Sequence, residues 1–270
     1  MDVDSLPAAP AQALGGALAR YLAQPRHVHG TSAPSDMGVV AGLLRPADVI
    51  LVEGASRFST AVKYLTQSTW SHAALYVGDR LGRRNEHGEA LCIVEADVAE
   101  GVRAVPLSQF AGLHLRVCRA VSLRDDEAQA VIGHAVSCLG HRYDLRNVFD
   151  LLRYLFPTPP VPLRWRRRLL ALGSGDATRA ICSTLVAQAF AAVRYPILPL
   201  VEQRSTNDPL CPACVEEILH VRHHSLYVPR DFDVSPYFAV VKPTLVAGFD
   251  HHALRWADTA ALQAEAAMAK

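Results

Sequence analysis

The chain has 270 residues, of which 50% are hydrophobic and 20% are charged. This composition excludes an intrinsically disordered chain, and the length is sufficient to bury a core without disulfides. The 27 basic residues nearly balance the 26 acidic ones, which argues against a protein that binds nucleic acid through its overall charge. We therefore expect one globular domain with short additions, or at most two small domains, and no nucleic-acid partner.

The N-terminal segment shows neither a signal peptide nor a lipoprotein signal, because MDVDSLPAAPAQALGG is acidic and has no apolar core. The most apolar stretch, 181–201, is interrupted by Arg194, Pro196 and Pro199, so we predict no transmembrane segment. Together these features predict a cytoplasmic protein with reduced cysteines.

Composition divides the chain into three regions. Residues 1–40 are rich in Ala, Pro, Gly and Ser and are predicted to form a flexible arm, with a short helix within 11–24. Residues 41–245 are predicted to form the main domain, and the Ala-rich residues 246–270 a peripheral helix.

Strands and helices of the main domain are predicted in blocks rather than in strict alternation. Apolar runs bounded by turn residues predict strands within 43–54, 71–78, 90–98, 113–121 and 235–243. Apolar spacing and capping signals predict helices within 58–67, 125–140, 145–156 and 177–193. Blocks of this kind favour an α+β fold, in which an antiparallel sheet or a small barrel packs against helices.

Cys182 is the candidate nucleophile, because it lies near the predicted start of the helix at 177–193. The positive end of a helix dipole lowers the pKa of a thiol there. Position alone leaves a second interpretation open, since cysteine is among the most frequently buried residues and a lone helical cysteine is often part of a core.

His72 and Glu95 are candidates for a base and its partner. Glu95 interrupts the apolar run of its strand, and a carboxylate in such a run is costly unless it is paired. If the strands pair so that Val77 opposes Ala90, His72 opposes Glu95, with Cβ atoms about 5 Å apart. A slip of two residues would leave them as diagonal neighbours. The alternative for His72 is a hydrogen-bonded core histidine.

Together the three residues form the pattern of a nucleophile, a base and a group that orients the base. His72 would accept the proton of Cys182 and later protonate the leaving group, while Glu95 would fix the tautomer of His72. The backbone N–H of Cys182 or Ser183 would bind the oxyanion.

Six segments resemble the circularly permuted, YaeF/YiiX-like branch of the NlpC-type papain-like cysteine hydrolases. They are RPADVILVEG, QSTWSHAALYVG, IVEA, GHRYD, ICSTLVAQAF and VPRDFDVSPYF. The resemblance runs from about Leu43 to Lys242. In ordinary papain-like enzymes the cysteine precedes the histidine, whereas here His72 and Glu95 precede Cys182. The resemblance implies that residues 41–245 form a catalytic domain with a permuted papain-like fold.

The resemblance also implies cleavage of an amide or ester bond through an acyl-enzyme, without a cofactor. By it, Tyr143 in GHRYD would line the site and assist the oxyanion, although a packed aromatic is an equally simple interpretation. Trp70, which lies close before His72, is a further candidate for contact with the substrate. Relatives include cell-wall peptidases and lipid acyltransferases. We therefore expect an amidase or peptidase, with a lipid acyl hydrolase or acyltransferase as the alternative and a non-catalytic binding module as a third possibility.

Two features fall outside this scheme. Cys211 and Cys214, with His220 and His223, form a conceivable zinc set, but the spacing is short for a zinc finger and we favour free thiols or a local disulfide. The basic segment Trp165–Arg168 could contact a membrane surface or an anionic head group, although a solvated basic face is the simpler interpretation.

Overall fold

The computed structural model describes residues 33–97, 100–141, 181–205, 210–211, 214–242 and 252. The predicted helices at 11–24 and 145–156 lie outside these residues, as does the basic segment Trp165–Arg168. The predicted C-terminal helix at 246–270 also lies outside them, apart from His252.

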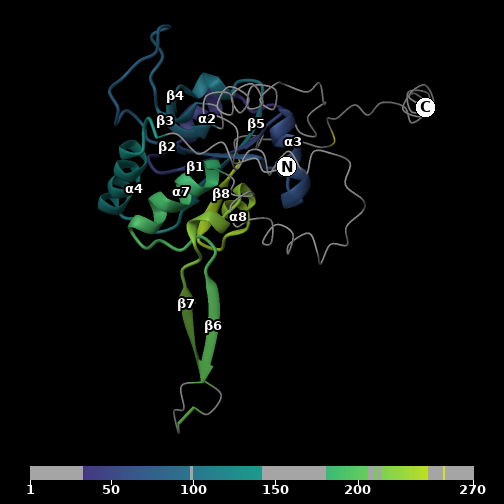
Figure 1. Cartoon of the computed structure of the whole chain (residues 1–270), viewed down its shortest axis with the longest axis vertical. Coiled ribbons are helices and arrows are strands. Elements are labelled where there is room, and N and C mark those ends of the chain that lie inside the picture. The colour runs from purple at the N-terminus through teal and green to yellow at the C-terminus, as the bar shows by residue number, and fades with distance from the viewer. Residues whose placement is uncertain are drawn as a thin grey trace, which may run out of the picture.

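A six-stranded antiparallel sheet lies at the centre of the fold (Figure 1). Its strand order is β4-β3-β2-β1-β5-β8, and every neighbouring pair is antiparallel. The sheet is open, with β4 and β8 as its edges among the described residues, so the fold is the predicted sheet and not a closed barrel. The strands are β1 (Val49–Glu53), β2 (His72–Tyr76), β3 (Ile93–Asp97), β4 (Gly101–Val105), β5 (His114–Ala120) and β8 (Phe238–Val241).

Helices flank the sheet. They are α2 (Met37–Leu43), α3 (Arg57–Thr66), α4 (Asp125–Ser137), α7 (Ile181–Ala192) and α8 (Pro229–Val234), with short 3-10 helices η2 (Leu107–Phe110) and η3 (His224–Leu226). α7 packs against β2 and β3 and runs beside α4. The predicted strands and the predicted helices at 58–67, 125–140 and 177–193 are all found near their expected positions.

Both faces of the sheet are covered, which explains why its central strands are apolar almost throughout. Ala73 and Leu75 point to the face covered by α4 and α7, while Ala74 and Ile50 point to a second core on the other face. A strand covered on both sides buries successive residues, as in the fully buried β1.

α7 is a buried helix. Its sequence ICSTLVAQAFAA is apolar around most of its circumference, and Leu185, Val186 and Phe190 are fully buried against the sheet and α4. A helix held in this way places the side chains of its first turn rigidly with respect to β2.

The segment before β1 is tied to the domain. α2 begins after the N-cap Asp36, whose side chain accepts hydrogen bonds from Gly38 and Val39. Ser35 Oγ accepts a hydrogen bond of 2.9 Å from the backbone N–H of Leu115 in β5. Residues 35–43 thus cross the predicted boundary between the arm and the main domain.

A hairpin of β6 (Leu200–Ser205) and β7 (Val215–His220) projects from the sheet and helices (Figure 1). Its sequences LVEQRS and VEEILH mix polar and apolar residues without a clear alternation and are largely exposed, so they gave no strand signal. Within the described residues, no helix is both long and apolar enough to cross a membrane.

Candidate active site

The candidate residues meet at one end of the sheet, where β1 and β3 end and β2 and β4 begin. His72 is the first residue of β2, and Glu95 lies in the middle of β3. Ala74 pairs with Glu95, so the assumed register was wrong by two residues. His72 and Glu95 are therefore diagonal neighbours on the same face, the arrangement expected for a slip of two residues.

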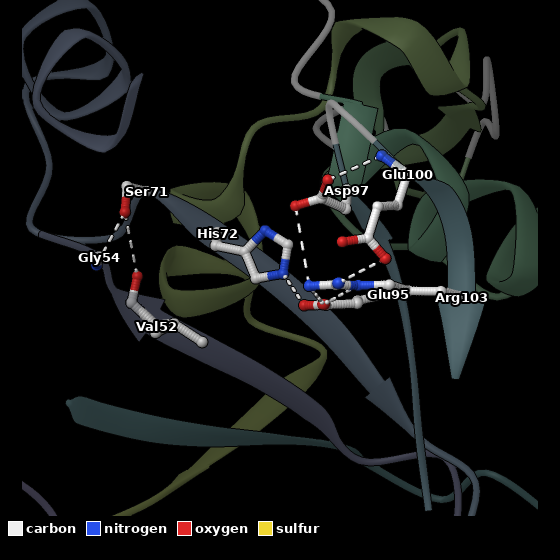
Figure 2. A network of polar contacts seen from close by, with 8 residues as sticks. All are labelled: Val52, Gly54, Ser71, His72, Glu95, Asp97, Glu100 and Arg103. Atoms are coloured by element: carbon white, nitrogen blue, oxygen red, sulfur yellow. Dashed lines mark hydrogen bonds and ion pairs between the residues drawn. The ribbon is translucent and has the colours of Figure 1, made fainter. Parts of the chain in front are cut away.

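A short hydrogen bond joins His72 to Glu95, with 2.7 Å between Nε2 and Oε2 (Figure 2). The second ring nitrogen of His72 is turned away from Glu95. The His72 side chain is 22% exposed, whereas Glu95 is 4% exposed. The carboxylate thus holds the ring from the buried side of the site.

Cys182 lies in the first turn of α7 and is 3% exposed. Its thiol forms a hydrogen bond with the side chain of His72 and also receives hydrogen bonds from the backbone of Ala73 and Ser183. Burial alone would raise the pKa of the thiol, but the charge of His72 and these hydrogen bonds outweigh it and hold the pKa below its ordinary value.

His72 shows the opposite shift. Burial by itself would lower its pKa, but the nearby Cys182 thiolate, followed by Glu95, raises the pKa to about 10. A thiol with a lowered pKa beside an imidazole with a raised pKa favours a thiolate–imidazolium pair, which is the reactive form of a cysteine nucleophile.

Arg103 completes the network and was missed by the sequence analysis. It lies in β4 directly opposite Glu95, and its Nε and Nη2 lie 2.9 and 2.8 Å from Glu95 Oε1 (Figure 2). Burial would raise the pKa of Glu95, but hydrogen bonding to His72 and the charges of His72 and Arg103 keep it below its ordinary value. A sequence signal for Arg103 did exist, because Glu95 and Arg103 are close enough in the chain to face each other across a tight hairpin.

The backbone before His72 is clamped to β1. Ser71 N–H donates to Val52 O at 3.1 Å, and Ser71 Oγ accepts from Gly54 N–H at 2.9 Å (Figure 2). Gly54 has no room for a side chain, because an added Cβ would lie 2.2 Å from Ser59 Oγ. This clamp fixes the entry to β2 and hence the position of the imidazole.

Trp70, predicted to contact the substrate, is buried at 3% exposure. Its indole stacks on His114 with ring centroids 5.4 Å apart, lies 4.9 Å from the guanidinium carbon of Arg116, and donates from Nε1 to Asp233 at 3.0 Å. Among the described residues Trp70 therefore packs between β5 and α8, where it braces the segment that leads to His72.

The predicted oxyanion residues have different outcomes. Ser183 Oγ is buried and donates to Tyr227 O at 2.8 Å, so its side chain points into the core. Its backbone contributes a hydrogen bond to Cys182, which is compatible with the predicted role of the N–H. Tyr143 lies outside the described residues.

The weak zinc candidates do not form a metal site in the described part of the chain. Cys211 and Cys214 form a disulfide, one of the two arrangements favoured from the sequence, which leaves no thiolate for a metal. The expectation of reduced cysteines is therefore wrong for this pair. His220 Nε2 lies 2.8 Å from Glu202 Oε2, and the His223 ring lies against His224. No group of three or more potential ligands is present among the described residues.

A cavity of about 400 Å³ opens near the other end of β2, beside Tyr76 and Cys92. Its lining does not include His72, Glu95 or Cys182. Residues 150–178, beside which an apolar tunnel would favour a lipid substrate, lie outside the described residues.

Comparison with known proteins finds a matching family model. The model of the "permuted papain-like amidase enzyme, YaeF/YiiX, C92 family" matches residues 44–154, a span that contains His72, Glu95 and Arg103 and ends before Cys182. A crystal structure of the metalloprotein YiiX from Escherichia coli O157:H7 is similar at 16% identity and a TM-score of 0.42, covering 73% of this chain and 96% of that chain. No curated protein matches the chain.

Proposed function

We propose that the chain is a cysteine hydrolase, as expected from the match of residues 44–154 to the permuted papain-like amidase family, and that it cleaves an amide bond through an acyl-thioester on Cys182. The observation that carries the proposal is the central position of His72, which is hydrogen-bonded to both Cys182 and Glu95. This is the order of contacts required of a nucleophile, a general base and an orienting group.

In the first half of the reaction, the Cys182 thiolate attacks the carbonyl carbon of the amide. The negative charge moves to the carbonyl oxygen, and a backbone N–H at the start of α7 stabilises it. The imidazolium of His72 then donates its proton to the leaving nitrogen, so the C–N bond breaks, the amine departs and the acyl group stays on sulfur.

In the second half, neutral His72 accepts a proton from water as the water attacks the thioester carbonyl. Collapse of the second tetrahedral intermediate releases the carboxylic acid and restores the thiolate–imidazolium pair. Glu95 holds the imidazole by Nε2 in both halves, so the other ring nitrogen carries the transferred protons.

The proposal is tested by the rate at which iodoacetamide modifies Cys182 near pH 6. At this pH an ordinary thiol is largely protonated, whereas a thiolate paired with His72 remains reactive. We expect Cys182 to be alkylated at least about tenfold faster in the wild type than in His72→Ala. Peptide mapping separates Cys182 from the buried Cys118, which is an internal control because burial raises its pKa to about 12.

Equal rates of Cys182 modification in the wild type and in a folded His72→Ala variant would refute the proposal. They would favour the interpretation of Cys182 as a core thiol and of the chain as a binding module. If instead Cys182 is activated and the enzyme hydrolyses fatty-acyl esters but no amide, the lipid acyl hydrolase alternative is correct.

A further inference from the structure

We infer that Arg103 is a positioning residue, which keeps Glu95 ionised and directs it at His72. This inference rests on the proposed function. The two carboxylate oxygens of Glu95 have separate partners: Oε2 binds His72 Nε2 at 2.7 Å, and Oε1 receives Arg103 Nε at 2.9 Å and Nη2 at 2.8 Å. Arg103 therefore occupies one side of the carboxylate and leaves the other for the imidazole.

The burial of Glu95 explains why such a partner is needed. A carboxyl group removed from water favours its neutral form unless nearby positive charge or hydrogen-bond donors oppose this. A neutral Glu95 could donate a hydrogen bond from its O–H to His72 Nε2, and the neutral ring would then carry its hydrogen on the nitrogen that should accept the proton of Cys182. An ionised Glu95 accepts from Nε2–H instead, which leaves the other nitrogen available.

Arg103 is itself held by two further carboxylates. Its Nη1 lies 2.9 Å from Glu100 Oε2, and its Nη2 lies 3.8 Å from Asp97 Oδ2 (Figure 2). Three carboxylates thus surround one guanidinium. Arg103 can therefore orient Glu95 while the network keeps a net negative charge, which favours the imidazolium of His72.

The geometry of the hairpin makes arginine suited to this position. Glu95 and Arg103 are direct cross-strand partners in β3 and β4, so their side chains leave the sheet on the same face. Two guanidinium nitrogens contact a single carboxylate oxygen, which a lysine ammonium cannot reproduce. We therefore expect lysine to preserve the charge but to position Glu95 less well.

The test is the pH profile of Cys182 alkylation by iodoacetamide in the wild type, Arg103→Gln, Arg103→Lys and the control Arg83→Gln. Arg83 is an exposed arginine outside the network, so its replacement should leave the profile unchanged. We expect the acid limb of Arg103→Gln to move upward by about one pH unit, equivalent to a tenfold loss of reactivity at low pH. Arg103→Lys should recover part of this loss.

Profiles of Arg103→Gln and the wild type that coincide would overturn the inference, because a merely structural arginine does not set the ionisation of Cys182. If Arg103→Gln does not fold, Arg103→Lys becomes the test. An upward shift of its acid limb by less than about one pH unit supports the inference, and no shift overturns it. Failure of the proposed function would look different, because Cys182 of the wild type would then be alkylated no faster than Cys182 of His72→Ala.

Discussion

At the scale of single residues, the site depends on the two side-chain partners of His72. Nε2 is bonded to the buried Glu95, while the side chain also hydrogen-bonds Cys182. Each charged form stabilises the other: the thiolate raises the pKa of His72, and the imidazolium lowers the pKa of Cys182. The chemistry we propose is a consequence of this coupling.

The coupling predicts the pH dependence of kcat/KM. Below the lowered pKa of Cys182 the thiol is protonated and cannot attack, so activity should rise as pH increases through that value. Above about 10 the imidazolium loses the proton needed by the leaving amine, so activity should fall. A profile that rises only near about pH 8.5, the pKa of an ordinary thiol, would contradict the ion pair.

Glu95→Gln separates the charge of Glu95 from its shape. The amide can still accept a hydrogen bond from His72, but it carries no charge and leaves Arg103 without its closest carboxylate. We expect kcat/KM to fall about 10²- to 10⁴-fold, measured with a chromogenic amide or ester. The control is Glu86→Gln, which removes an exposed carboxylate. Activity within twofold of the wild type in Glu95→Gln would exclude Glu95 as the orienting group.

At the scale of elements, the contacts between the end of β1 and the start of β2 position the imidazole independently of Glu95 and Cys182. Gly54 N–H, Ser71 Oγ and Val52 O form a continuous set of contacts at the end of β1. Because His72 follows Ser71, a shift of this clamp moves the base relative to the helix that carries Cys182.

Gly54→Ala tests the clamp. The added Cβ would lie 2.2 Å from Ser59 Oγ and 2.8 Å from Ser71 Oγ, so the segment must move. We expect the free energy of unfolding to fall by about 1–3 kcal/mol in urea titrations, together with reduced activity. The matched control is Gly42→Ala in α2, where nothing lies within 4 Å of the added Cβ and alanine should stabilise the helix by about 0.5–1 kcal/mol. Equal effects of the two substitutions would show that Gly54 is not constrained.

Elements were predictable from the sequence where burial imposed a clear pattern. The apolar runs of β1 and β2 and the apolar helix α7 fall where expected. The short strand β4 was missed because its residues GVRAV follow a turn closely and include a charge, and with it Arg103 was missed. The exposed β6 and β7 carry too little apolar pattern to identify a hairpin from sequence.

At the scale of the whole molecule, the candidate site joins residues far apart in the chain. His72 and Glu95 are brought together by neighbouring antiparallel strands, so two sequence segments sufficed to predict their proximity. The register required the structure, because the long connection between β2 and β3 does not fix it. Cys182 reaches the same place because α7 packs across β2 and β3, a tertiary contact that local sequence patterns do not encode.

His72 and Glu95 precede Cys182 in the chain, yet the fold brings all three residues to the same end of the sheet. β1 to β4 form a continuous antiparallel series from which His72, Glu95 and Arg103 project, and the later helix α7 contributes the thiol. We expect catalysis to require the packed domain, because the base lies in the series β1 to β4 and the nucleophile lies in α7.

The most direct test of the central claim is to detect the acyl-thioester on Cys182. The wild-type enzyme is mixed with a p-nitrophenyl acyl ester, quenched in acid within the first turnover and analysed by peptide mass mapping. We predict one acyl group on the Cys182 peptide, released by hydroxylamine, and no such adduct in Cys182→Ala or His72→Ala. Turnover by a folded Cys182→Ala variant, or stoichiometric acylation at another residue, would contradict the account.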